Sequence, residues 1–152
     1  IDHLEGQLLH VLGNGAVRPN ATVSSGAITS ISPTVKTASV GLPYNSVVKT
    51  LRPEAGGDDG AAQGRIKRVF EVTFRFLDTL GAEFAPVGGS FDEVLFRTGS
   101  DPMDSAPPLF TGDKTVQFHG SFETDGQVIV RQTQPLPFEL SAIITRTITH
   151  SG

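Results

Sequence analysis

Apolar residues in this chain alternate with polar ones instead of recurring every three or four positions, and this period of two is the strongest constraint on its fold. The clearest example is Val69 to Leu77, where one face collects Phe70, Val72, Phe74 and Phe76, and the other Glu71, Thr73 and Arg75. Such alternation predicts a strand with one buried and one polar face. The best helical candidate, Ser90 to Phe96, is short and alternates as well as it rotates. We therefore expect an all-β protein.

Two further segments extend the strand pattern. Lys114 to Glu123 places Val116, Phe118 and Phe122 on one face together with Gly120, and Gln127 to Thr133 continues the alternation. The intervening Thr124-Asp125-Gly126 supplies a turn, which predicts a hairpin. Pro137 to His150 is rich in Ile and Thr, whose branched side chains favour a pleated strand, so we expect a long final strand there.

The first forty residues differ from the rest in the density of their turns. Gly13-Asn14-Gly15, Pro19-Asn20 and Ser24-Ser25-Gly26 interrupt short apolar segments, which predicts about five strands in a small meander or barrel. The expected strands are Gln7 to Leu12, Ala16 to Arg18, Thr22 to Val23, Ala27 to Ile31 and Val35 to Val40. We expect a small β unit over residues 1–40 and an antiparallel β-sandwich over residues 41–152.

Two long stretches rich in Gly and Pro, Arg52 to Gly64 and Thr98 to Pro108, lack strand patterning. Loops of this length in a compact domain are usually functional or packed against a neighbour. We interpret both as contact or gating loops, with plain flexible connectors as the alternative.

Composition excludes several function classes. The chain has 12 Lys and Arg against 16 Asp and Glu, a net charge of −4, which argues against a phosphate-binding surface of the kind found in nucleic-acid modules. It has no Cys, which removes zinc-thiolate sites, iron–sulfur clusters, thiol catalysis and disulfides. No apolar run approaches the roughly 20 residues that span a bilayer. Ile1 to His10 show neither an initiating Met nor a signal peptide, so we expect a soluble piece of a longer protein.

Catalytic and metal-binding patterns are not found either. The four His residues, His3, His10, His119 and His150, have no pair at metal-ligand spacing. Asp58-Asp59-Gly60 and the pair Asp101 and Asp104 are acidic clusters without the register of a calcium loop, so turn formation is their better interpretation. We expect no enzyme activity, no cofactor and no metal.

The remaining candidates are interface residues. Arg65, Lys67 and Arg68 form a basic group at the start of the long strand, which is either a contact with a partner or a solvated strand end that discourages edge pairing. Asp58, Asp59, Asp101 and Asp104 on the two loops complete the candidate interface. Only 18% of residues are charged, below the roughly 25% of typical domains, and depletion of charge is typical of surfaces covered by neighbours.

Several segments together resemble the C-terminal part of tail proteins of short-tailed bacteriophages and prophages, the group of tail nozzle, tail tubular B-like and DNA-stabilisation proteins. The resemblance begins with Val40-Gly41-Leu42-Pro43-Tyr44, Val47 to Leu51, and Gln63 to Arg68. It continues through Phe91 to Arg97, Ser100 to Asp104, Leu109 to Lys114 and Gln134 to Pro137. His3 to Gln7 with Gly13 to Gly15 resemble the small β unit that precedes the Gly-Leu-Pro-Tyr segment in such proteins.

This resemblance implies a structural role in the virion. Copies would assemble into a ring, a hexamer by family resemblance, or a tube through which DNA leaves, touching adaptor, fibre or other tail proteins. DNA would pass without sequence-specific binding, and no membrane contact is implied for this fragment. The family has no catalytic residues to carry over. A net charge of −4 per copy would repel DNA if acidic groups face the lumen.

Two other function classes remain open. One is a ligand- or carbohydrate-binding β-sandwich module of a tail or cell-surface protein, although Tyr44 is the only Tyr and the chain has no Trp, the rings that usually stack on sugars. The other is an enzyme fragment whose partner residues lie outside this sequence.

Overall fold

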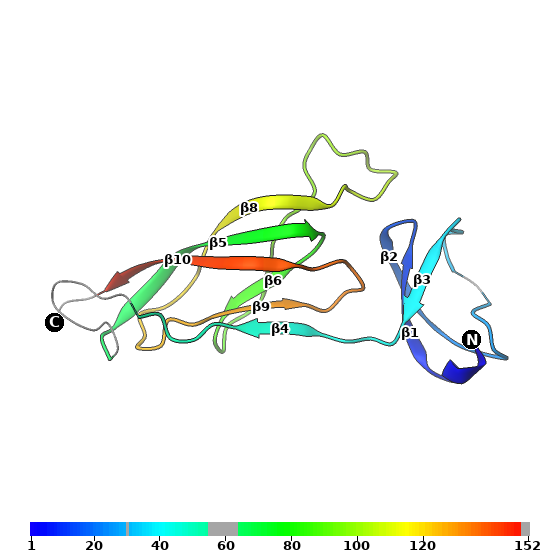
Figure 1. Cartoon of the computed structure of the whole chain (residues 1–152), viewed down its shortest axis with the longest axis horizontal. Coiled ribbons are helices and arrows are strands. Elements are labelled where there is room, and N and C mark those ends of the chain that lie inside the picture. The colour runs from blue at the N-terminus through cyan, green and yellow to red at the C-terminus, as the bar shows by residue number, and fades with distance from the viewer. Residues whose placement is uncertain (30, 55–63, 150–152) are drawn as a thin grey trace.

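The computed structural model describes residues 1–29, 31–54 and 64–149. Across this part of the chain the only helical element is a single 3-10 turn, η1 (Asp2–Leu4), and ten strands form three antiparallel sheets (Figure 1). The strands are β1 (Leu8–Gly13), β2 (Ala16–Thr22), β3 (Ala38–Gly41), β4 (Ser46–Lys49), β5 (Lys67–Thr79), β6 (Glu83–Pro86), β7 (Asp92–Glu93), β8 (Phe110–Gln117), β9 (Val128–Gln132) and β10 (Leu140–Thr149). The all-β prediction is confirmed.

The first sheet has the strand order β2-β1-β3 and buries Leu9, Val11 and Val23. Asn14 and Gly15 connect β1 to β2 with φ of 52° and 76°, the two positive values that a tight hairpin turn requires. The sheet has three strands where about five were expected. Two of the expected strands are one, because β2 continues through Pro19-Asn20 instead of turning there. A register shift in this edge strand lies at the same place, and an edge bulge tolerates the missing N–H of proline. The expected strand from Ala27 to Ile31 is wrong, since the described residues of that range make only an isolated bridge between Ala27 and Ser24.

The other two sheets face each other as a sandwich. One has the order β10-β5-β8 and the other β4-β9-β6-β7. A single apolar cluster joins them, with Phe74 of β5 against Phe84 of β6 at a ring distance of 5.7 Å, and Val128 and Val130 of β9 in the same cluster. The antiparallel sandwich is thus confirmed. The predicted division between residues 40 and 41 falls within β3.

The alternation predicted for β5 is confirmed at Val72, Phe74 and Phe76, which are all buried. It is wrong at Phe70, which is only partly buried. Against β10, Arg146 pairs with Glu71 and Thr147 pairs with Val69, so Phe70 is the extra residue of a bulge. Because of the bulge, the residues of β5 that precede Phe70 point to the face opposite to the expected one, so Val69 and Lys67 point inward.

The hairpin predicted at Thr124-Asp125-Gly126 is wrong, since β8 pairs with β5 while β9 pairs with β4 and β6 in the opposite sheet. The chain after Gln117 crosses between the sheets. Phe122, expected in the core, is therefore 56% exposed. The predicted long final strand is confirmed as β10, which pairs with β5 along its length.

Candidate interaction surface

The structure separates the residues that the sequence grouped as candidate interface. Arg65, Lys67 and Arg68 lie at the beginning of β5, whereas Asp101 and Asp104 lie in the loop between β7 and β8, away from that end of the sandwich (Figure 1). Asp58 and Asp59 lie outside the described residues. The candidate residues thus do not form one site.

Lys67 is not a surface residue. Its side chain is 2% exposed because the Phe70 bulge turns it inward, and its Nζ donates a hydrogen bond to the backbone oxygen of Pro53 at 3.2 Å. Its backbone pairs with Glu123 in an isolated bridge. The buried ammonium holds Pro53, which precedes β5 in the sequence, against the sandwich through this hydrogen bond. Lys67 is therefore not accessible to a partner.

Arg68 points outward instead and belongs to an exposed surface. Its Nε donates to the oxygen of Gly120 at 3.0 Å, and its guanidinium carbon lies 6.0 Å from the centre of the Phe122 ring. Ile148 of β10 is its cross-strand partner, and Ile66 is exposed two residues before it. This end of the β10-β5-β8 sheet therefore presents the apolar side chains of Ile66, Phe122 and Ile148 near the Arg68 cation. The partly buried Arg65 lies just before it.

Asp101 has an internal role. Its carboxylate accepts hydrogen bonds from the backbone N–H of Thr98 at 2.6 Å and from the Thr98 hydroxyl at 3.0 Å. These bonds, the backbone one first, hold the pKa of Asp101 below its ordinary value. Asp104 is exposed in the same loop.

Sequence reasoning missed Arg97, which organises that loop. Its guanidinium donates to the oxygens of Pro102 at 2.7 Å and of Ser105 at 2.8 Å. A single Arg at the start of a loop rich in Pro and Gly gives no signal of this role in the sequence.

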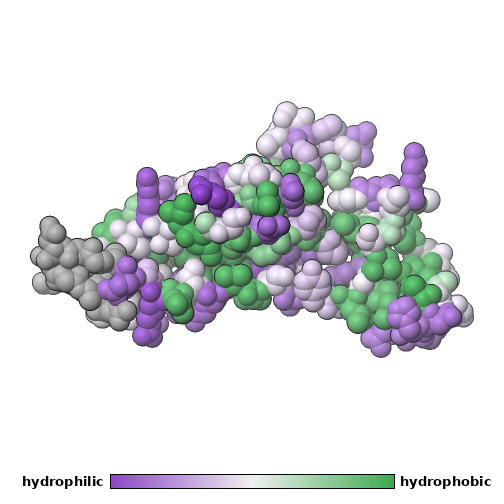
Figure 2. Space-filling view, viewed as in Figure 1, coloured by the Kyte–Doolittle hydropathy of each residue, from purple (hydrophilic) through white to green (hydrophobic). Residues whose placement is uncertain are grey.

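The segment that joins the two halves carries a dense group of exposed apolar side chains. Figure 2 shows apolar atoms reaching the surface over both the sandwich and the N-terminal sheet. Within residues 42–51, which we call the linking segment, the exposed apolar residues are Leu42, Tyr44, Val47, Val48 and Leu51, with Tyr44 at 75% and Leu51 at 87%. The segment includes β4, an edge strand, which pairs with β9 on one side and with no strand of this sheet on the other.

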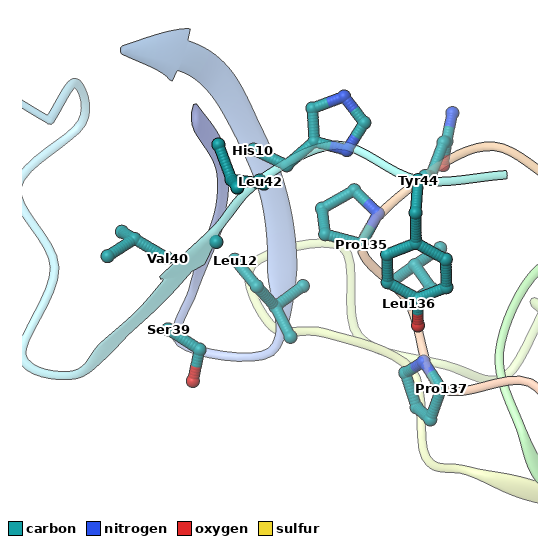
Figure 3. Close-up of a pocket in the computed structure, with 11 residues that line it drawn as sticks. His10, Leu12, Ser39, Val40, Leu42, Tyr44, Pro135, Leu136 and Pro137 are labelled. Carbon is teal, nitrogen blue, oxygen red and sulfur yellow. The ribbon is translucent and has the colours of Figure 1, made fainter. Parts of the chain in front are cut away.

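A cleft of about 410 Å³ lies beside the linking segment. Figure 3 shows its lining side chains arriving from the N-terminal sheet on one side and from the segment before β10 on the other. The lining is mainly apolar, with Leu12, Val40, Tyr44, Leu136 and Pro137 among its residues, and His10, Ser39 and Gln134 supply polar groups. A second cleft, of about 250 Å³, runs between the β1–β2 turn and residues 93–97.

Among the described residues, no three His, Asp or Glu side chains are placed to hold a metal ion. Within the same ranges, none of the helical structure is long and apolar enough to cross a membrane. No protein-family model matches this sequence, and no curated protein matches it at a significant level.

Proposed function

We propose that this chain is a structural component of a bacteriophage tail, one subunit of a ring or tube through which DNA is ejected, located in the virion and in contact with copies of itself and with other tail proteins. The family resemblance of the sequence supplies the identity of the particle. The observation that carries the structural role is the linking segment, where five large apolar side chains are exposed within ten residues.

Single exposed apolar residues are normal on protein surfaces. A group of them in and beside one edge strand is different. Val47 and Val48 lie in β4, and Leu42, Tyr44 and Leu51 flank it. The outer edge of β4 combines unpaired backbone groups with this apolar area, and such edges pair with other chains unless they are covered. A subunit of a permanent assembly covers such an edge with its neighbour. A closed ring does so without open-ended growth.

The experiment that tests this proposal locates the chain in a particle. Electron microscopy of the virion, with an epitope tag on this region, is expected to place the label on the distal tail in a symmetric ring. A label that is absent from purified particles would refute the role.

A ligand-binding module is the second candidate, and the cleft beside the linking segment favours it. Its volume of about 410 Å³ falls in the usual range of small-molecule sites, roughly 300–1,000 Å³. A glycan array probed with the chain discriminates between the candidates, because saturable binding that is lost in Tyr44→Ala supports the ligand-binding module.

A further inference from the structure

The four-stranded sheet β4-β9-β6-β7 has an even number of strands, each antiparallel to the next. Its two edge strands, β4 and β7, therefore run in opposite directions. If a second copy lies beside the first in the same orientation, its β7 faces the β4 of the first in antiparallel fashion. The ladder would continue from one copy to the next without a change of pattern.

The backbone groups at both edges point in the directions that this arrangement needs. Thr50 donates its N–H to Val128 of β9 at 2.9 Å, and Val94, just after β7, donates its N–H to Ala82 beside β6 at 2.8 Å. In an antiparallel ladder alternate residues direct their N–H and C=O to opposite sides. Val47 and Lys49 on one edge, and Glu93 and Leu95 on the other, therefore direct these groups away from the sheet.

The side chains of the same four residues are complementary. Val47 and Leu95 are 59% and 74% exposed, and Lys49 and Glu93 are also exposed. Among the ion pairs of the described residues, none includes Lys49 or Glu93. The β4 edge thus offers a cation, Lys49, beside an apolar side chain, Val47. The β7 edge offers an anion, Glu93, beside an apolar side chain, Leu95.

One register satisfies both patterns. If Lys49 lies opposite Glu93 of the next copy, Val47 lies opposite Leu95, and both pairs project from the outer face because Val47 and Glu93 flank the outward pair of Arg131 and Glu83. The same register brings the exposed Leu51 opposite Phe91 on that face, and on the inner face it brings Val48 opposite the buried Val94. A shift of two residues would place Lys49 opposite Leu95 or Val47 opposite Glu93.

We propose that copies of this chain associate head to tail by pairing β4 of one with residues 91–96 of the next, with Lys49 opposite Glu93 and Val47 opposite Leu95. The contact is heterologous, so it closes into a ring or continues as a filament. The proposal rests on the proposed function in one respect, that copies of the chain meet, and it names the surface through which they do so.

Charge exchange tests the pairing. Lys49→Glu and Glu93→Lys each place like charges in opposition, and each is expected to weaken self-association of the 152-residue chain about tenfold, whereas the double variant Lys49→Glu with Glu93→Lys recovers it. Association is measured by native mass spectrometry and light scattering over a concentration series. Lys36→Glu, the same change on an exposed loop of the N-terminal half, is the matched control and leaves association unchanged. Circular dichroism verifies that each variant is folded.

Cross-linking tests the register independently, since the chain has no Cys of its own. A mixture of Val47→Cys and Leu95→Cys chains is expected to form disulfide-linked dimers under mild oxidation, because directly opposite residues have Cα atoms within disulfide range. Either variant alone does not form them.

The outcomes separate the two proposals. Oligomers that persist in both single charge variants, with no dimer from the mixed Cys variants, overturn the β4–β7 pairing and leave the tail role standing. A wild-type chain that stays monomeric at millimolar concentration, with no disulfide-linked dimer from the mixed Val47→Cys and Leu95→Cys chains, also overturns the pairing. The tail role is then decided separately, by the label in the particle.

Discussion

Phe74→Ala and Phe122→Ala make the same chemical change at two residues that the sequence pattern placed in the core, and they test the sandwich and its crossover together. Phe74 is fully buried, with the rings of Phe76 and Phe84 at 5.9 and 5.7 Å. Phe122 is 56% exposed because the chain leaves the sheet before reaching it. The two variants are therefore expected to differ strongly in stability.

The size of the difference follows from burial. A fully buried Phe removes about 150–250 Å² from water, which at about 25 cal/mol per Å² is about 4–6 kcal/mol as an upper bound. Measured Phe→Ala changes in cores cost about 3–5 kcal/mol. Phe122 keeps somewhat less than half of that burial, so its truncation costs about 2 kcal/mol at most.

Urea denaturation followed by circular dichroism measures both free energies of unfolding. We expect Phe74→Ala to lower the free energy of unfolding by at least about 1 kcal/mol more than Phe122→Ala, with similar m-values. Equal losses in the two variants would contradict the separation of β8 and β9 into different sheets, because a β8–β9 hairpin would bury Phe122 as deeply as Phe74.

Three further predictions follow from single contacts. Lys67→Met is expected to change the free energy of unfolding by less than about 1 kcal/mol, because Met fills the same space, whereas Lys67→Ala costs about 2–4 kcal/mol through the cavity it leaves. Thermal melts measure both, and similar effects of the two variants would contradict the burial of the Lys67 side chain. Gly120→Ala would put a Cβ 2.7 Å from a backbone oxygen of β5 and is expected to cost about 1–3 kcal/mol, whereas at Gly41 a Cβ meets nothing within 4 Å and the same change is close to neutral. Hydrogen bonds from Thr98 hold the pKa of Asp101 below its ordinary value. The ionised carboxylate therefore stabilises the loop at pH values above its unfolded pKa, and this contribution disappears as the pH falls through the lower folded pKa. An NMR titration followed at the Thr98 amide should show that lowered midpoint, and a midpoint at or above the unfolded value would refute the contact.

The sequence was sufficient for the fold class and for the centre of β5, because alternation over Val72, Phe74 and Phe76 depends only on the strand itself. It was not sufficient at Phe70. A bulge is determined by the register of the neighbouring strand, here β10, and nothing within the Lys67–Phe70 segment distinguishes a regular pleat from one with an extra residue. For that reason Lys67 was placed on the surface although it is buried.

The predicted hairpin after β8 failed for a related reason. Thr124-Asp125-Gly126 is a sound turn sequence, and Gly126 has a positive φ of 57°. Local turn chemistry says that the chain turns, however, and does not say which sheet receives the next strand. That choice follows from the apolar faces of β9, whose Val128 and Val130 complete the core opposite β5.

The candidate interface shows the same limit. The charged residues that stand out in the sequence, Lys67 and Asp101, are used inside the chain. Val47 and Leu95 look like ordinary strand residues, and their exposure follows from the strand order, which puts β4 and β7 at the two edges of one sheet. Edge position is a property of the assembled sheet, so no local pattern indicates it.

The pairing of β5 with β10 also bears on how the chain is made. β5 is the middle strand of its sheet, and one of its two partners, β10, follows it only after β6, β7, β8 and β9. During synthesis its backbone edge on that side therefore leaves the ribosome well before the strand that pairs with it, and contacts of such long sequence separation form slowly. A nascent chain stalled before Leu140 would thus be a substrate for chaperones that hold exposed strands, and one released after Thr149 would not.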